Sequence, residues 1–317
     1  MNDYNTTNNA YTEKIKHGYS WNFFAPLFVI FAGIFWGIIG LFSNPLDLAG
    51  LDSIQITQLR CLVSALSLIA ITLIKNPKLF RVRIKDIWMF IGTGIISIVF
   101  FNVCYFISIQ ESTLSVACTL LYTGPCFVMI ISCILFHEKF TVKKGISLCI
   151  AIIGCAFITG LIGGSKGIHI TPYAFAVGIG SGLGYGLYSI FGRIALKKYN
   201  WLTVITYTFS FASLSLLPFC KLNRIAETVS SNPSALIYIL LLGLLSTLAP
   251  FLLYTKGLEH METSKAAMFT FVEPMFATII SVAVFHEGFS AGHAIGMAAI
   301  ILSITMLNVT FRKNKQN

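Results

Sequence analysis

Charged residues are scarce in this sequence. Of its 317 residues only 11% are Asp, Glu, Lys or Arg, which is less than half of the roughly 25% found in soluble domains. Hydrophobic residues make up 56%, and the mean hydropathy is +0.80. A water-soluble fold of this length cannot bury so much apolar surface, and water does not tolerate it outside. The composition therefore predicts an all-α polytopic membrane protein.

Signatures of metal binding and catalysis are also missing. The eight cysteines form no CxxC pair, so neither a disulfide framework nor a zinc site is indicated. The His-Glu pairs at 137–138 and 286–287 have Thr141 and Ser290 where an HExxH zinc protease needs its second His. No P-loop is present, so ATP is not expected to act directly. We expect no cofactor, no metal, no catalytic residues and no enzyme activity.

The net charge of +10 does not indicate a nucleic-acid partner, because the basic residues lie in short gaps between apolar runs. In membrane proteins such residues record orientation. With the N-terminus inside, 18 Lys and Arg face the cytoplasm, three face outward (Lys166, Lys221 and Arg224) and Arg60 lies within a span. We therefore expect a multi-pass protein of the cell membrane with both termini cytoplasmic. The polar N-terminus shows no cleavable signal.

Spanning about 30 Å of hydrocarbon takes roughly 20 helical residues. The charged and turn-rich gaps leave ten apolar runs of about this length, which we expect to be helices because each must satisfy its backbone internally. The runs are 21–42, 54–74, 87–109, 112–136, 145–165, 170–192, 200–220, 234–255, 266–285 and 289–311.

The ten runs divide into two copies of one unit. A shift of 149 residues aligns the two halves without a gap from Tyr105 to Phe140, and nine of the sixteen positions from Pro125 to Phe140 are identical to those from Pro274 to Phe289. Five helices per copy is an odd number, so the second copy enters the membrane from the opposite side. Inverted repeats of this kind are typical of secondary transporters, whose substrate site lies near the midplane between the halves.

These repeats set the expected domains. They are a cytoplasmic tail at 1–20, a first five-helix repeat at 21–165, a second five-helix repeat at 166–311 and a cytoplasmic tail at 312–317.

Several motifs also resemble a known family. In the first copy they are FWG at 35–37, Arg60 and the P…FHEKFT stretch at 125–141; in the second they are YTKGLEHMETSKAAMFTFVEP at 254–274 and FHEGFS at 285–290. Over about residues 26–311 the chain resembles the EamA family of the drug/metabolite transporter superfamily. The resemblance implies a permease of the cytoplasmic membrane, commonly an exporter of amino acids or other small metabolites.

Two residues with a fixed charge lie well inside the spans, Glu273 and Arg60. A charge at the bilayer centre costs about 2.5–3.5 kcal/mol and usually faces a cavity or a partner. Glu273 is a candidate site for a proton or a substrate ammonium group, and its repeat mate is Gly124, so the repeated fold does not require the acid. Arg60 is a candidate for a substrate carboxylate. Structural pairing is the alternative for both residues.

Polar aromatics inside the spans are candidates for the walls of the same cavity, since their rings can hold an apolar side chain or a cation. Packing alone is the alternative for each of them. Together with one neutral polar residue, these candidates are Trp36, Tyr105, Tyr122, Tyr185, Tyr188 and Asn102.

Pro125 and Pro274 are expected to kink their helices, because proline removes a backbone hydrogen bond. Lys256 and Lys265 flank a cytoplasmic loop and are candidate gate residues, with marking of the inner face as the alternative. Glu138 and Glu287 are repeat mates at helix ends, where a capping or pairing role in the fold is expected.

The function that these observations favour is secondary active transport of a small molecule by alternating access around a midplane cavity. Proton coupling through Glu273 is one expectation. The expected partners are a small-molecule substrate, the lipid bilayer and protons, and two fused halves indicate that a monomer suffices. A membrane channel or sensor is the alternative; an intramembrane enzyme is weaker, because it needs clustered His, Asp or Glu.

Overall fold

The structure is a computed structural model that describes residue 21 and residues 23–163 and 170–308. The expected tails at 1–20 and 312–317 lie outside the described residues, as does Lys166. Every regular element in the described ranges is helical. This confirms the all-α class.

Nine helical segments of the described ranges are long and apolar enough to cross a membrane. They are Phe23–Leu48, Ser53–Lys75, Ile84–Glu111, Leu114–Phe136, Pro172–Leu196, Trp201–Phe219, Ser234–His260, Thr263–Val284 and Ala291–Asn308. The run predicted at 145–165 forms α8 (Val142–Ile158), which has 17 residues. At 1.5 Å per residue α8 is about 25 Å long, somewhat short of the usual 30 Å span.

Several spans are built from more than one element. The first contains α2 (Ile39–Leu48); the second is α3 alone (Ser53–Lys75), and η1 (Pro77–Phe80) follows it in the connection to the third span. The third joins η2 (Ile84–Asp86), α4 (Ile87–Ile91), η3 (Gly92–Val99) and α5 (Phe100–Glu111), and the fourth joins α6 (Leu114–Leu121) and α7 (Gly124–Phe136).

The remaining elements follow α8. They are α9 (Pro172–Leu196), α10 (Trp201–Leu216), η4 (Leu217–Phe219), α11 (Leu222–Ser231), α12 (Ser234–Gly243), η5 (Leu244–Leu248), α13 (Ala249–His260), α14 (Thr263–Phe269), α15 (Val272–Val284) and α16 (Ala291–Asn308). Both η3 and η5 are π-helical, and the 149-residue shift places η5 on Ile95–Val99 of η3.

The two helices that carry the aligned prolines are interrupted rather than kinked. Pro125 and Pro274 stand in the first turns of α7 and α15, and a turn separates each from α6 or α14. Proline is tolerated in the first turn because an N–H there has no partner within the helix. The expected bend in mid-helix is therefore corrected to a break between two helices.

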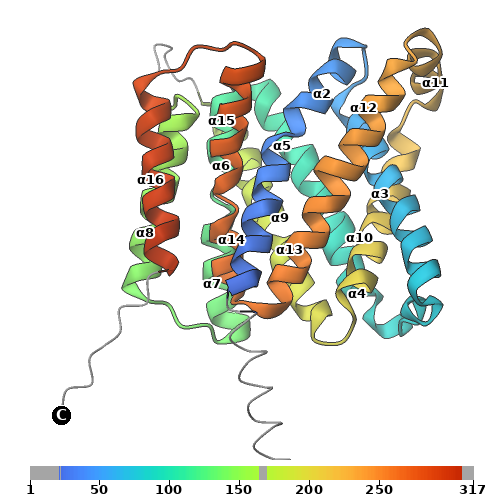
Figure 1. Cartoon of the computed structure of the whole chain (residues 1–317), viewed down its shortest axis with the longest axis horizontal. Helices are drawn as coiled ribbons and strands as arrows, with labels where there is room; N and C mark the ends of the chain where they lie inside the picture. Colours follow the sequence, from blue (N-terminus) through green and yellow to red (C-terminus); the bar gives the residue numbers. More distant parts are fainter. Residues whose placement is uncertain (1–20, 22, 164–169, 309–317) are drawn as a thin grey trace, which may run out of the picture.

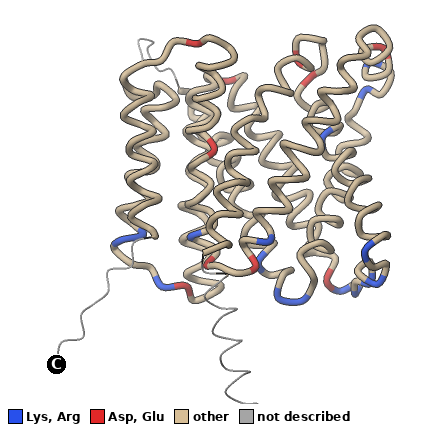
Figure 2. Tube along the Cα trace, in the orientation of Figure 1, with Lys and Arg blue, Asp and Glu red and all other residues tan. Residues whose placement is uncertain are grey.

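The helices stand side by side, with the α8 and α16 pair at one edge and α3 and α10 toward the other (Figure 1). Lys and Arg gather at one end of the bundle, the lower end in Figure 2. We call this the basic end; the connections at 75–84, 136–142, 196–201 and 260–263 lie there. The far end holds the amphipathic helix α11 and the connections at 48–53 and 111–114.

The pair of α8 and α16 packs tightly. A Cβ added to Gly154 would lie 2.9 Å from the Gly296 carbonyl oxygen, and one added to Gly296 would lie 2.4 Å from that of Gly154. Nearby, the Ser303 hydroxyl donates to the Ser147 carbonyl at 2.7 Å. Small residues that let two helices approach closely are the usual basis of packing in membranes.

Candidate functional site

A cavity of about 600 Å³ lies within the bundle, a size that suits a small ligand. Its walls come from the first four spans, from α9 and from α12, α13, α14 and α15. Asp47, Ser53 and Leu114 line it at helix ends far from the basic end, so the cavity reaches that far side. It collects most of the residues that the sequence singled out: Trp36, Arg60, Asn102, Tyr105, Tyr122, Pro125, Tyr185, Tyr188 and Glu273.

Glu273 enters the cavity from the first turn of α15, just after the break that precedes Pro274. The unpaired N–H groups of a first helical turn favour a negative charge. Tyr185 of α9 donates its hydroxyl to Glu273 Oε2 at 3.1 Å. The carboxyl is therefore oriented by another helix of the same half of the sequence, while it still lines the cavity.

Arg60 of α3 lines the same cavity. Its Nε atom is buried and has no hydrogen-bond partner among the described residues. No described carboxylate lies within 4.0 Å of its guanidinium, although Glu273 is near enough to influence it electrostatically. Apart from Asp47 at its mouth, the cavity lining thus holds one acid and one base, which share the space without a described ion pair between them.

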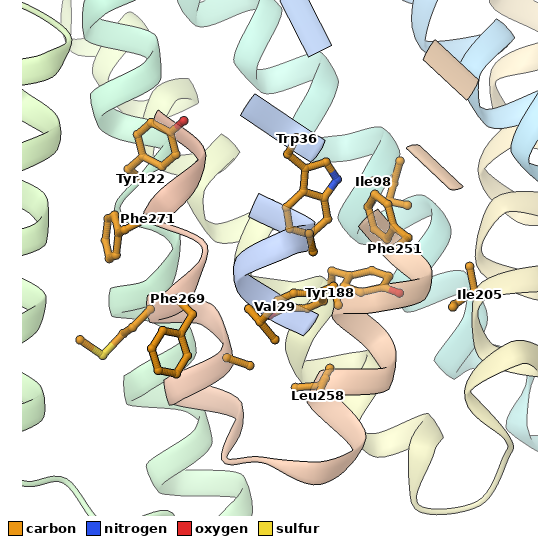
Figure 3. Close-up of a cluster of buried hydrophobic side chains, with 14 of the residues drawn as sticks. Val29, Trp36, Ile98, Tyr122, Tyr188, Ile205, Phe251, Leu258, Phe269 and Phe271 are labelled. Carbon is orange, nitrogen blue, oxygen red and sulfur yellow. The ribbon is translucent and has the colours of Figure 1, made fainter. Parts of the chain in front are cut away.

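Aromatic rings close the inner part of the cavity. The Trp36 ring lies 5.1 Å from Phe251 and 5.4 Å from Tyr254, and the Tyr188 ring lies 4.9 Å from Phe251 edge to face. Figure 3 shows Trp36, Tyr188 and Phe251 converging from three separate helices. Such a wall can hold the apolar part of a ligand.

Two other predicted residues are already hydrogen-bonded within the protein. The Asn102 amide donates to the Ile98 carbonyl at 2.7 Å, and the Tyr105 hydroxyl lies 2.9 Å from Cys118 Sγ. Both side chains line the cavity, where they supply polarity in positions that their hydrogen bonds fix.

Toward the basic end the bundle is closed. The Tyr188 hydroxyl pairs with Thr255 and the Ser189 hydroxyl with Tyr254, each at 2.6 Å, which joins α9 to α13. Buried apolar side chains continue this layer, among them Val29, Leu258 and Phe269 (Figure 3).

Polar contacts seal the surface of the basic end. The Glu138 carboxylate accepts hydrogen bonds from the backbone N–H groups of Thr263 and Ser264 at 2.6 and 3.1 Å, and from the Ser264 hydroxyl at 2.5 Å. Buried Lys144 lies 3.1 Å from the Glu262 carboxylate. These contacts tie the end of α7 and the start of α8 to the start of α14 at the basic end.

The candidate gate residues do not line the cavity. Lys256 pairs with Glu259 at 2.5 Å and Lys265 with Glu262 at 3.1 Å, both at the basic end. Lys265 therefore makes its ion pair at the basic end and not with Glu273 in the cavity. Pro274 is buried and is also absent from the cavity lining.

Sequence reasoning missed part of the lining. Tyr254 and Phe251 form the aromatic wall, and Ser43, Asn44 and Asp47 line the mouth. The alignment of Tyr105 with Tyr254 was a usable signal, since both members of that pair line the cavity. The mouth residues carried no such signal, because a short polar stretch at the end of a run resembles a loop.

Comparison with known proteins gives a consistent picture. The profile of the EamA-like transporter family matches the chain twice, at residues 23–160 and 173–309. An uncharacterized transporter of Archaeoglobus fulgidus is 26% identical over 272 residues, which covers 85% of this chain and 93% of the relative. The uncharacterized inner membrane transporter YicL of Salmonella typhimurium is 22% identical over 292 residues, covering 90% and 95%.

The fold is shared with a solved crystal structure at a TM-score of 0.74. The two chains are 18% identical, and the match covers 89% of this chain and 96% of the other. The family profile spans nearly the whole length, the helices are long and apolar, and the relatives bear the name of transporters. The chain is a multi-pass membrane protein that belongs to the EamA-like transporter family.

Proposed function

We propose that this protein is a secondary active transporter that works by alternating access, with two inverted five-helix repeats rocking around the cavity. Two successive family matches and the 149-residue alignment support the repeats. The odd number of helices in each copy supports their inversion, with α8 as the fifth helix of the first copy. The closed basic end supports a transporter over a channel, since a channel needs a continuous polar path.

The same proposal sets the orientation. Lys and Arg concentrate on the cytoplasmic side of membrane proteins, and here they gather at the basic end. Placing that end in the cytoplasm of a cell membrane makes this conformation outward-facing, and both chain termini are then cytoplasmic.

The substrate class follows from one observation, the unneutralised Glu273 and Arg60 in a single, largely apolar cavity. A buried charge without a partner is costly, and a zwitterion supplies both missing partners at once. We propose that the substrate is an amino acid or a close relative, with its ammonium group at Glu273 and its carboxylate at Arg60. Its side chain would then face the aromatic wall. Export is the direction that the family resemblance favours.

The first experiment is ligand-induced thermal stabilisation of the purified protein. The panel compares each amino acid with the amine that lacks its carboxylate and the acid that lacks its amino group. Saturation at 100 times Kd stabilises a protein by about 2.7 kcal/mol, which a melting curve resolves. Wild type should respond most strongly to the amino acid. Glu273→Gln should lose the response to amines, and Arg60→Gln the response to acids.

The matched control is Glu227→Gln, which removes a carboxylate from exposed α11 and should leave every response unchanged. An amino-acid response that survives in both Glu273→Gln and Arg60→Gln would remove the zwitterion assignment. Transport by proteoliposomes under a pH gradient then tests coupling. We expect Glu273→Gln to abolish gradient-driven uptake while keeping its fold; unchanged uptake would exclude proton coupling at Glu273.

A further inference from the structure

Two repeat-related glutamates leave their helices with the same backbone geometry. The preceding residues, His137 and His286, both have φ of 56° in the left-handed region. The N–H of Glu138 donates to the Ser132 carbonyl at 3.3 Å, and that of Glu287 donates to the Ser281 carbonyl at 3.2 Å. Ser132 and Ser281 are themselves 149 residues apart. The two carboxyl groups therefore start from equivalent positions at opposite ends of the bundle.

Their side chains nevertheless make different contacts. Glu138 holds the first residues of α14 through three hydrogen bonds, two from backbone N–H groups and one from the Ser264 hydroxyl. Glu287 is exposed and accepts a hydrogen bond from the Ser281 hydroxyl of the preceding helix α15. The repeat counterpart of Ser264 is Ser115, in the first turn of α6. Glu287 makes no described contact with it.

The packing of the neighbouring helices also differs between the two ends of the bundle. At the basic end α14 packs against α7, whereas the corresponding pair of α6 and α15 is not closely packed among the described residues. Leu114 at the start of α6 instead lines the mouth of the cavity. The contact made by Glu138 thus accompanies a closed end, and its missing counterpart accompanies an open end.

The packing of α8 against α16 behaves differently under the repeat. Shifting each residue of the Gly154 and Gly296 contact by 149 gives Ser303 and Ser147, which are themselves in contact. This interface maps onto itself, so exchanging the roles of the two repeats leaves it unchanged. The interface between α8 and α16 is therefore suited to be the fixed axis of the proposed rocking movement. The contacts of Glu138 and Glu287 are suited to the parts that change between its two states.

We propose that Glu138 and Glu287 are paired closing residues, each holding its end of the transporter shut in one of two states. In the state opposite to the present one, Glu287 accepts hydrogen bonds from the free N–H groups of the first turn of α6 and from Ser115, while Glu138 releases α14. This inference rests on the inverted repeats and alternating access of the proposed function. It concerns closure and is independent of the substrate.

The test measures, without any ligand, the distance between two helix ends on the side of the bundle far from the basic end. Spin labels are placed on Glu111→Cys and Phe289→Cys in a chain whose eight native cysteines are replaced, and distances are read by double electron–electron resonance. Hydrogen bonds to a charged group contribute about 1.5–3 kcal/mol. Glu138→Gln should therefore raise the population with a short outer distance by about tenfold or more. Adding Glu287→Gln should reverse that gain.

Single hydroxyl deletions provide a milder pair in case Glu138→Gln does not fold. Ser264→Ala should shift the distance distribution in the direction of Glu138→Gln, and Ser115→Ala should oppose it. The exposed Glu227→Gln should shift nothing. Loss of thermal stability with an unchanged distance distribution, or shifts of the same sign from both glutamates, would overturn the proposal. Failure of every ligand to bind would refute the substrate assignment while leaving this distance test valid.

Discussion

At the scale of single residues, the buried charge at the basic end has partners within the protein, whereas the buried base in the cavity has none among the described residues. Buried Lys144 is satisfied by Glu262, by the Ser264 hydroxyl and by the Lys139 carbonyl. Arg60 keeps a buried Nε without a described partner. Removing one partner of a buried charge pair is strongly destabilising, because the other charge is left buried and unpaired. The unpaired Nε of Arg60 agrees with the ligand-binding role proposed for this residue.

The Glu262 pair predicts how stability depends on pH. Burial alone would raise the pKa of Glu262, but hydrogen bonds from Lys144 and Lys265 outweigh it and hold the pKa below its ordinary value of 4.5. A lowered folded-state pKa stabilises the fold above pH 4.5, and this contribution is lost as pH falls through the folded value. The melting temperature should therefore drop on acidification below about pH 4.5. In Glu262→Gln the drop should be smaller.

The control for this measurement is again Glu227→Gln, whose acid-induced drop should match that of wild type. An equal drop in Glu262→Gln would show that other groups carry the acid sensitivity. Sequence reasoning counted Lys144 among the inner loop charges. It could not foresee the burial of Lys144, because the partner Glu262 lies 118 residues away in the sequence and only the folded structure brings the two together.

At the scale of helices, α9 packs closely against the fourth span and places Tyr185 in the cavity. A Cβ on Gly182 would lie 2.5 Å from Thr123 Oγ1 and 2.7 Å from the Leu120 carbonyl oxygen. The backbone of α9 is therefore pressed against the break between α6 and α7. This contact also fixes Tyr185, one turn further along, which orients Glu273.

The substitution Gly182→Ala should lower the free energy of unfolding by about 1–3 kcal/mol, the usual cost of overpacking. On the same helix, Gly192→Ala meets only the Leu258 Cδ2 atom at 3.5 Å, an ordinary contact. It should be neutral or stabilising, because alanine is the better helix former. Thermal unfolding of the two variants compares them directly; equal melting temperatures would contradict the close approach.

Helix boundaries were predictable from sequence where charges or turns interrupted the apolar runs. The prediction was wrong for the end of the first helix, which lines the cavity. The first run was cut at 42, yet the helix continues to Leu48 through Ser43, Asn44 and Asp47. Polar side chains there face the cavity, so the polarity that signals a loop in sequence belongs to a helix. The breaks before Pro125 and Pro274 were foreseen as kinks, since the sequence locates a proline but not the turn that precedes it.

At the scale of the whole molecule, the repeat makes a prediction about topology. Phe140 and Phe289 are repeat mates that are 64% and 56% exposed, at the basic end and the far end respectively. In a cysteine-free background, a membrane-impermeant maleimide added to intact cells should label Phe289→Cys and spare Phe140→Cys. Opening the cells should make both react. Labelling of both in intact cells would contradict the proposed inversion.

The cavity was predictable in outline because an inverted repeat places a site between its halves, and the charged and aromatic candidates do meet there. Its conformation was not. Two similar copies do not indicate which end of the bundle is closed, because in the proposed cycle each half adopts either arrangement. The difference between the ends then lies in small contacts such as those of Glu138 and Glu287.

The mouth of the cavity has a pharmacological consequence. In the proposed orientation, a compound in the external medium meets Arg60 and Glu273 without entering the bilayer or the cytoplasm. A permanently charged molecule is then no poorer an inhibitor for being unable to permeate the cell. If it carries a bulky group that stays at the level of Asp47 and Leu114, it wedges the outer helices apart and arrests the cycle from outside.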